Sequence, residues 1–462
     1  MDALPPAAPA ALAAPPEDAD PSFADLLAAR PALSAHALDG LVFEGVPLAA
    51  VADALGTPTW VTSAGTLRRR HGLLRDALAA AGLRATIHYA TKANGNLAVL
   101  RTLAREGAGA DVVSGGELRA ALAAGIPASG VVFSGVGKTA EEMRLALASG
   151  VMQLNVESAE EAEALSAVAS SLGATAPVAL RVNPDVDART HAKITTGRAE
   201  NKFGVALADA PALYARLAAL PGLRPVGLAV HIGSQITGGL AAYRDAYARL
   251  ADLARSLLAA GLPVERLDCG GGLGIPYRDE IAPTPEAFAG AIRAGLGDLA
   301  TGPRALPVMV EPGRWIAGPA GVLLSRVVLV KRGATRRFVV LDAAMNDLLR
   351  PSLYDAWHGI VPAAPHHLSP AAPLAPADVV GPVCESGDTF ARARPLPERL
   401  APGDLVALLD AGAYGATMSS TYNARPLAAE AMVDGPRWAE TRARQPVEDL
   451  LARQSVPPWL LG

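Results

Sequence analysis

One pattern recurs along the middle of the chain: a short apolar run rich in β-branched residues, a polar or glycine-containing turn, and an Ala, Leu, Glu and Arg segment with helical spacing. Eight such units in succession favour a closed (β/α)8 TIM-type barrel, with a large open doubly wound sheet as the alternative. The predicted strands cover 87–91, 110–113, 131–134, 152–156, 178–182, 227–231, 266–269 and 308–311, and helices are expected at 97–106, 117–124, 140–148 and 159–172.

The flanks of this region follow different patterns. Residues 1–40 begin with an Ala/Pro-rich stretch, which predicts a disordered tail. Past the barrel, strand-like runs follow one another without regular helices between them, at 321–330, 337–341, 378–383 and 404–409. These runs predict a separate all-β domain of β-sandwich or Greek-key type, so that the fold class is α/β plus all-β.

Composition narrows the function. Hydrophobic residues make up 51% of the 462 residues, but no run reaches the ~18–20 uncharged residues of a membrane span, so no membrane partner is expected. A balance of 41 basic and 45 acidic residues, without a basic block, argues against a nucleic-acid partner. Two cysteines cannot form a disulfide framework, which favours a reducing, cytoplasmic location.

The barrel hypothesis places an active site at the carboxyl ends of the strands. Polar residues do lie at or just after the ends of the apolar runs, in six places: Lys92 and Asn94, Asp111 and Ser114, Asn183, His231, Asp268 before the glycine-rich segment 270–274, and Glu311 with Arg314. A lone lysine or histidine at such a position is usually only solvated. Six endings that carry a lysine, a histidine, a glycine cluster and an acid beside an arginine indicate a functional site.

These residue types match one cofactor. The glycine triplet 270–272 offers backbone N–H groups to a phosphate, although a tight strand-to-helix turn explains it equally well. It does not match the dinucleotide-binding motif GxGxxG, because the third glycine of that motif would fall at position 275, which is Ile275. Lys92 could form a Schiff base, Glu311 could face a pyridine nitrogen, and His231 could lie on a ring. Together they indicate a pyridoxal 5'-phosphate site.

Longer motifs then carry a family resemblance. The chain resembles the diaminopimelate decarboxylases, members of the alanine-racemase-like (fold type III) pyridoxal-phosphate enzymes, over about residues 41 to 435. The matching segments are 89–94 (YATKAN), 191–197 (HAKITTG) with 202–204 (KFG), 231–235 (HIGSQ), 270–274 (GGGLG), 311–314 (EPGR), 345–351 (MNDLLRP), 381–388 (GPVCESGD) and 422–426 (YNARP).

The resemblance implies roles for individual residues. Lys92 resembles the lysine that binds the cofactor covalently, and Cys384 the thiol that protonates the reacting carbon, delivered from the partner subunit of a homodimer with shared active sites. The other implied cofactor-binding residues are His231, Ser234, Gly270, Gly271, Gly272, Glu311, Pro312, Gly313, Arg314 and Tyr414.

Substrate choice depends on the far end of the implied site. Arg350 supplies a forked cation suited to a second carboxylate, and Glu385 an acceptor for a second ammonium group. Arg314, Tyr354 and Tyr414 would assist. The implied reaction is decarboxylation of meso-2,6-diaminopimelate to L-lysine and CO2, the last step of lysine biosynthesis. A surface or interdomain salt bridge is the other interpretation of Arg350.

The resemblance also sets the domain boundaries. It implies a barrel over 66–315 and a β domain, made of 41–65 and 316–462, that completes the active site. A racemase or broad basic-amino-acid decarboxylase of the same fold and a non-catalytic homologue remain as alternatives. No metal site is expected, because the pair His366 and His367 lies in a Pro-rich loop without other ligands nearby in sequence.

Overall fold

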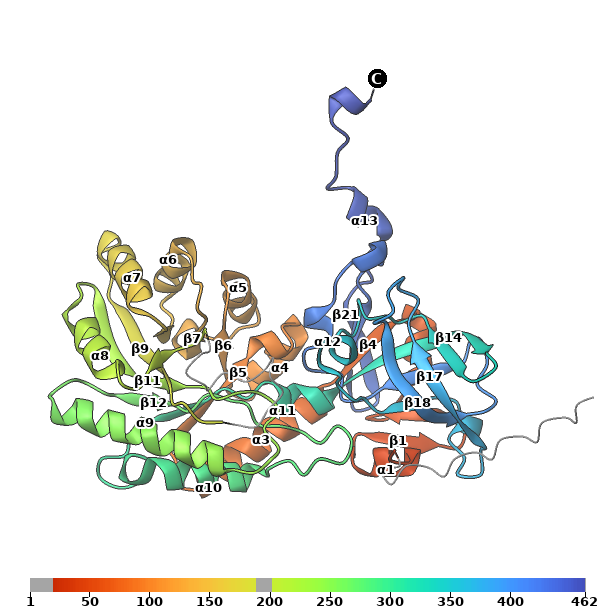
Figure 1. The fold of residues 1–462 in the computed structure, drawn as a ribbon, viewed down its shortest axis with the longest axis horizontal. Coiled ribbons are helices and arrows are strands. Elements are labelled where there is room, and N and C mark those ends of the chain that lie inside the picture. Colours follow the sequence, from red (N-terminus) through yellow and green to blue (C-terminus); the bar gives the residue numbers. More distant parts are fainter. Residues whose placement is uncertain (1–19, 188–201, 462) are drawn as a thin grey trace, which may run out of the picture.

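The computed structural model describes residues 20–187 and 202–461. Within these residues eight parallel strands close into a barrel: four strands pair in chain order from β5 to β8, β8 pairs with β9, and the circuit returns through β11, β12 and β13 to β5 (Figure 1). The closed circuit confirms the predicted barrel over the open sheet. Its strands are β5 (Ala85–Ala90), β6 (Gly109–Val112), β7 (Val131–Phe133), β8 (Gln153–Val156), β9 (Ala176–Asn183), β11 (Leu223–Val230), β12 (Arg266–Asp268) and β13 (Val308–Val310), with β10 (Val205–Ala206) beside β9.

Helices surround the barrel because each β-α unit returns the chain outside the strands. Several begin at a Ser or Thr whose side chain accepts the N–H three residues on, as at Ser114, Thr139 and Ser158. The helices are α3 (Ala64–Ala80), α4 (Leu97–Arg105), α5 (Gly115–Ala123), α6 (Ala140–Ser149), α7 (Ala159–Ser171), α8 (Ala210–Ala219), α9 (Ala241–Ala259) and α10 (Pro285–Leu296).

A separate β-sheet lies beside the barrel, on the right of Figure 1. Strand β4, which precedes the barrel in the chain, lies between β14 and β20, which follow it. The sheet therefore draws on both sides of the barrel sequence. Its strands are β4 (Thr59–Ser63), β14 (Gly321–Arg332), β15 (Arg337–Leu341), β16 (Ile360–Pro362), β17 (Leu374–Val380), β18 (Thr389–Pro397), β19 (Leu405–Leu408), β20 (Ala429–Asp434) and β21 (Arg437–Arg442).

The predicted N-terminal tail needs correction. Residues 1–19 lie outside the described residues, but residues 20–40 are structured and include α1 (Phe23–Ala28) and β1 (Leu33–His36). A reciprocal capping box between Ser22 and Asp25 starts α1, and Leu26 is buried. Strand β1 belongs to a small sheet with β2 (Gly40–Phe43) and β3 (Val46–Pro47), and α2 (Leu48–Leu55) follows it. The Ala/Pro bias at the start of the chain obscured this capping signal.

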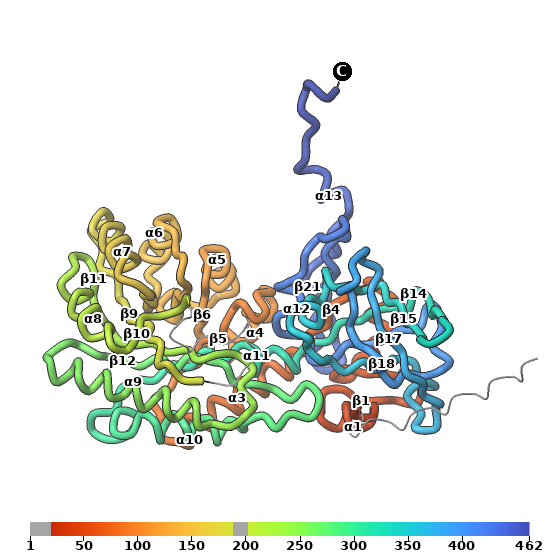
Figure 2. Tube along the Cα trace, in the orientation of Figure 1, coloured from red at the N-terminus to blue at the C-terminus, as the bar shows by residue number. Residues whose placement is uncertain are grey.

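The C-terminal segment leaves the body of the molecule. After β21 the chain extends outward with α13 (Val447–Leu451) and a final 3-10 turn (Pro458–Leu460), as Figures 1 and 2 both show. In the part of the chain that the structure describes, every helix is too short or too polar to cross a bilayer.

Candidate active site

A cavity of about 440 Å³ opens at the carboxyl ends of the barrel strands. This is where the barrel hypothesis placed the site, because all eight parallel strands end at the same face. Lys92, His231 and Glu311 all line it, so the fold brings three predicted cofactor residues together from distant parts of the sequence. The remaining lining residues are Val113, Ser134, Gly135, Val136, Gly137, Glu142, Asn155, Arg181, Phe203, Ala229 and Val230.

Lys92 lies in a single 3-10 turn, Thr91–Ala93, directly after β5. Its Nζ donates to Oδ2 of the fully buried Asp111 at 2.7 Å. Burial lowers the pKa of Lys92, but the charges of Asp111, Tyr414 and Glu311 outweigh burial and leave that pKa raised. The protein therefore holds Lys92 as an ammonium ion, oriented by the end of the neighbouring strand β6.

Buried carboxyl groups form the floor of the site. Glu311 follows β13, Asp268 ends β12, and a hydrogen bond joins their carboxyl groups. Burial, followed by the charges of Asp111 and Asp268, raises the pKa of Glu311 well above its ordinary value. Its Oε1 is buried and has no hydrogen-bond partner among the described residues. A buried carboxyl group with one unused acceptor oxygen fits a protonated pyridine nitrogen, as the cofactor would require.

His231 follows β11 and is neutral. The N–H of Gly271 donates to its Nδ1 at 3.1 Å, so that the ring proton is on Nε2. Burial, assisted by the charges of Arg181 and Lys92, lowers the pKa of His231 well below its ordinary value. An uncharged imidazole held by a backbone bond fits a role in packing against an aromatic ring.

The glycine triplet fills a narrow space between strand ends. A Cβ on Gly271 would lie 2.1 Å from the carbonyl oxygen of Glu311, and one on Gly270 would lie 2.2 Å from that of Val230. Gly270 donates its N–H to Asp268, and Gly271 donates to His231, whereas that of Gly272 has no acceptor among the described residues. The triplet therefore makes a tight turn, and the N–H of Gly272 is compatible with the expected anion site.

Arg314 connects several predicted cofactor residues. Its Nη2 donates to Ser234 at 3.1 Å, its Nη1 donates to Tyr277 at 2.7 Å, and its guanidinium lies 4.8 Å from the ring centre of Tyr414. The N–H of Tyr414 in turn donates to the Ala93 carbonyl at 2.7 Å, next to Lys92. Pro312 and Gly313 lead into this arginine and approach β5, where the Pro312 carbonyl accepts the N–H of Ala90.

Arg350, at the start of the short helix α12 (Arg350–Tyr354), is buried rather than on the surface. Its Nη1 donates to Nε2 of His358 at 2.8 Å, and its guanidinium lies 4.5 Å from the ring centre of Tyr277. Tyr277 thus joins the Arg350 and Arg314 groups. Burial acts to lower the pKa of Arg314 and Arg350, and the charge of Tyr354, at the other end of α12, acts to raise both pKa values.

Cys384 and Glu385 are exposed and do not line the cavity of their own chain. Asn423 Oδ1 accepts the N–H of Cys384 at 2.9 Å, and Asp388 accepts from the backbone of Val383 and Met345, so this loop is firmly held. The 191–197 motif that accompanies them in the resemblance lies outside the described residues.

Sequence reasoning missed several residues of the site. Arg181 pairs with Glu157 at 3.1 Å and lies over the ring of Phe203, and Asn155 bonds to Ser134. Arg181 follows the strand-end rule but lies one residue before the expected ending. His358 and Tyr277 gave no signal, because neither lies beside a catalytic motif in sequence.

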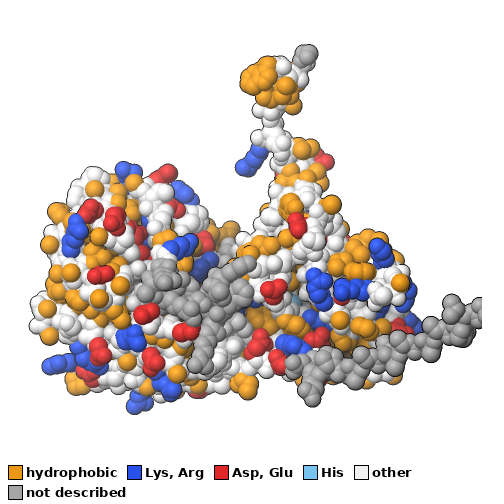
Figure 3. All heavy atoms as spheres, viewed as in Figure 1, with side chains coloured by type: hydrophobic (Ala, Val, Ile, Leu, Met, Phe, Trp, Pro, Cys, Tyr) orange, Lys and Arg blue, Asp and Glu red, His pale blue; other side chains and the backbone are white. Residues whose placement is uncertain are grey.

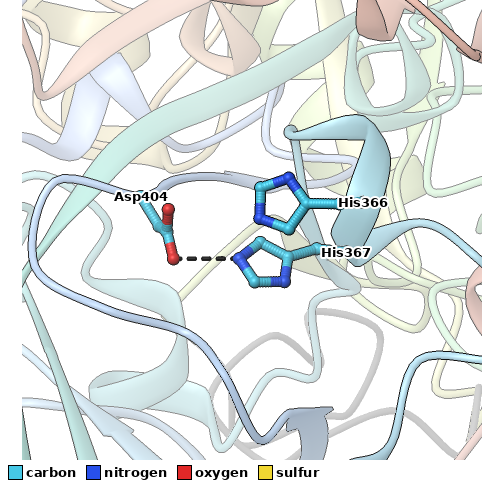
Figure 4. A group of neighbouring side chains, drawn as sticks. All are labelled: His366, His367 and Asp404. Atoms are coloured by element: carbon cyan, nitrogen blue, oxygen red, sulfur yellow. Dashed lines mark hydrogen bonds and ion pairs between the residues drawn. The ribbon is translucent and has the colours of Figure 1, made fainter.

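The pair His366 and His367 does have a third polar neighbour. Asp404, distant in sequence, accepts a hydrogen bond from His367 Nε2 at 2.9 Å (Figure 4). The same carboxylate oxygen also accepts the N–H of Ala401 at 2.8 Å. We interpret these contacts as a hydrogen-bonded connection between the 3-10 turn Pro365–His367 and the start of β19.

Comparisons with known proteins identify the family. Residues 64–318 match the family described as pyridoxal-dependent decarboxylase, pyridoxal binding domain. A diaminopimelate decarboxylase from Zymomonas mobilis is 49% identical over 423 residues, which cover 91% of this chain and 98% of that protein.

Solved structures give the same result. The crystal structure of diaminopimelate decarboxylase from Helicobacter pylori complexed with L-lysine is 39% identical, with a TM-score of 0.82 over 88% of this chain and 98% of that one. The enzyme from M. jannaschii in co-complex with L-lysine is 33% identical, with a TM-score of 0.87 over 94% of this chain and 100% of that one.

The barrel, its lysine-lined cavity and the family match define a pyridoxal-phosphate-dependent decarboxylase. Within that class, the chain belongs to the diaminopimelate decarboxylase family.

Proposed function

We propose that this protein removes one carboxylate of meso-2,6-diaminopimelate as CO2 and releases L-lysine, with pyridoxal 5'-phosphate as its cofactor. One arrangement carries the proposal: Lys92 and Glu311 line the same cavity, and the buried Arg350 is linked to Arg314 through Tyr277. Relatives crystallised with L-lysine support the same assignment.

The cofactor residues have distinct tasks in this proposal. Pyridoxal phosphate, when bound, supplies an electron sink beside the reacting carbon. Lys92 would hold it covalently through Nζ, Glu311 would keep a proton at the pyridine nitrogen, and His231 would pack against the ring. The N–H of Gly272, together with Ser234 and Arg314, would bind the phosphate.

Decarboxylation requires no base. It breaks the bond between the α-carbon and a carboxylate, leaves the electron pair at that carbon, and needs one proton afterwards. We assign this proton to the Cys384 thiol. Because Cys384 is exposed and does not line its own chain's cavity, the proposal places it in the site of a second subunit.

Substrate choice is assigned to the far end of the site. Arg350, with Arg314 and Tyr354, would bind the second carboxylate of diaminopimelate, and Glu385 with Tyr414 would contact the remaining amino group. Ornithine and arginine lack a distal carboxylate and would leave the buried guanidinium of Arg350 without an anionic partner. The proposal therefore includes selectivity against both amino acids.

Two further parts of the proposal concern the whole protein. The functional unit would be a homodimer with shared active sites, since Cys384 must come from a partner. Its location would be the cytoplasm, in keeping with two cysteines that are both free thiols.

A product assay tests the reaction. Purified protein loaded with pyridoxal phosphate is given meso-diaminopimelate, ornithine or arginine, and CO2 and amino-acid products are measured by mass spectrometry. We expect lysine and CO2 from diaminopimelate alone, and a loss of turnover of about a hundredfold or more in Cys384→Ala with the cofactor retained. Isomerised diaminopimelate without CO2 would support a racemase, and no reaction with any substrate would support a non-catalytic homologue.

Mixed subunits test the shared site. Lys92→Ala and Cys384→Ala proteins are each nearly inactive, but a dimer with one subunit of each type has one intact site of two. Equal mixing with subunit exchange should therefore restore about a quarter of wild-type activity. No recovery after demonstrated exchange would place Cys384 and Lys92 of one chain in the same site.

A further inference from the structure

The C-terminal arm, residues 446–461, projects from the body of the molecule (Figures 1 and 2). Among the described residues, its hydrogen bonds run only to other residues of the arm. Pro446 and Pro457 have extended backbone angles, φ −71° and ψ 148° and φ −58° and ψ 146°, which hold the arm outstretched on either side of α13. Among the described residues, the arm therefore makes no hydrogen bond to the body of the molecule.

Apolar side chains gather on this arm. Figure 3 shows hydrophobic atoms concentrated at its tip. The exposed fractions are 61% for Leu451, 56% for Val456, 81% for Trp459, 68% for Leu460 and 71% for Leu461. Contiguous exposed apolar groups of this kind mark interaction sites, and tryptophan is enriched at the energetic centres of interfaces.

The base of the arm is connected to the loop that carries Cys384 through residues 423–427. Gln445 and Leu427 exchange two hydrogen bonds, at 3.1 and 3.2 Å, and this fixes the point where the arm leaves the body. Four residues before Leu427, Asn423 binds the backbone of Cys384. The arm and the proposed proton donor are therefore both held by the segment 423–427.

We propose that the arm packs on a second copy of this chain, across the face that also delivers Cys384. This inference rests on the proposed dimer. Because Cys384 contacts Asn423 and the base of the arm contacts Leu427, we place a partner that receives Cys384 within reach of the extended arm. In a two-fold symmetric dimer each subunit then contributes one arm and contacts the arm of its partner. The apolar tips of both arms are buried.

The test compares three variants with wild type, all loaded with pyridoxal phosphate. One lacks residues 446–462, a second carries Trp459→Asp with Leu460→Asp, and the third is a control, Leu38→Asp. Leu38 is 92% exposed in the turn between β1 and β2, far from the arm in sequence. Sedimentation velocity over a wide concentration range gives the dimer dissociation constant, and decarboxylation is measured over the same dilutions.

We expect both arm variants to raise the dimer dissociation constant about tenfold or more, and their turnover to fall on dilution in parallel. The Leu38→Asp control should match wild type in both measurements. A dimeric wild type with arm variants of unchanged dissociation constant would overturn the arm contact and leave the shared site standing. A wild type that is monomeric while fully active would overturn the shared site as well.

Discussion

His358 shows how one buried side chain determines the state of another. Its Nδ1 bonds to the Leu409 carbonyl at 2.7 Å, so Nδ1 carries the proton and Nε2 accepts from Arg350. Burial, with the charge of Arg350, lowers the pKa of His358 well below its ordinary value and keeps the ring neutral. Arg350 is thereby held by an uncharged acceptor, and its charge remains for a ligand.

This arrangement makes His358 a positioning residue for the substrate end of the site. In His358→Ala the buried guanidinium of Arg350 loses its acceptor. A hydrogen bond to a charged group contributes about 1.5–3 kcal/mol, so KM for diaminopimelate should rise about tenfold to a hundredfold while kcat changes little. His358→Gln, which retains an acceptor, should restore much of the affinity. A fall in kcat of that size with an unchanged KM would contradict the role of His358 as a positioning residue.

At the scale of elements, the loop after β12 depends on glycine at defined positions. Gly270 and Gly272 have φ of +64° and +96°, and Gly271 packs against the backbone of Glu311. This close packing holds the ends of β11, β12 and β13 together, so that His231 and Glu311 face the same cavity. The loop after β12 therefore positions His231 and Glu311, which belong to other segments of the chain.

Two glycine substitutions test this role. Gly271→Ala would place a Cβ against the Glu311 carbonyl, so we expect a loss of about 1–3 kcal/mol in unfolding free energy and weaker cofactor binding. Gly290→Ala, in the exposed middle of α10 with open space around it, should instead stabilise the protein by up to about 1 kcal/mol. Urea unfolding and cofactor titration measure both effects. Equal stability of the two variants would show that the loop tolerates the added methyl group.

At the scale of the whole molecule, buried ion pairs connect segments that are distant in sequence. Arg30, after α1, binds Asp410 beyond β19, and its Nη2 donates to the Tyr277 carbonyl at 3.0 Å in the loop after β12. Both charged side chains are buried. The N-terminal segment thus joins the separate sheet to the active-site end of the barrel.

Removing Arg30 should be costly and dependent on pH. Burial already raises the pKa of Asp410 against the opposing effect of Arg30, and Arg30→Ala leaves a buried carboxylate without its counter-ion. We expect a loss of about 3–5 kcal/mol near neutral pH. Because the raised pKa penalises the ionised form, the loss should shrink as pH falls and Asp410 becomes protonated.

Urea unfolding at about pH 8 and about pH 5 measures this change. The control is Arg216→Ala, which removes an exposed pair with Glu163 and should cost at most about 1 kcal/mol at either pH. A loss in Arg30→Ala that is independent of pH would show that the arginine acts through packing alone.

Local periodicity was sufficient to predict the barrel and most of its strand ends. Alternating apolar runs and helical segments predicted all eight strands, and Lys92, His231 and Glu311 each follow one of them. Parallel strands in a barrel end at one face, so residues after different strands could be expected to meet.

Which side chains contact one another, and which charges they carry, depends instead on the packing of distant segments. The Lys92–Asp111 pair, the Arg350–His358 contact and the Arg30–Asp410 pair join residues whose separation in sequence leaves no periodic signal. The structured segment at 20–40 likewise depends on Asp410 and on the sheet that it packs against. Local sequence patterns indicate which face of a helix or strand is buried. The protonation of a side chain depends on its burial and on neighbouring charges, and these arise only once distant segments have packed together.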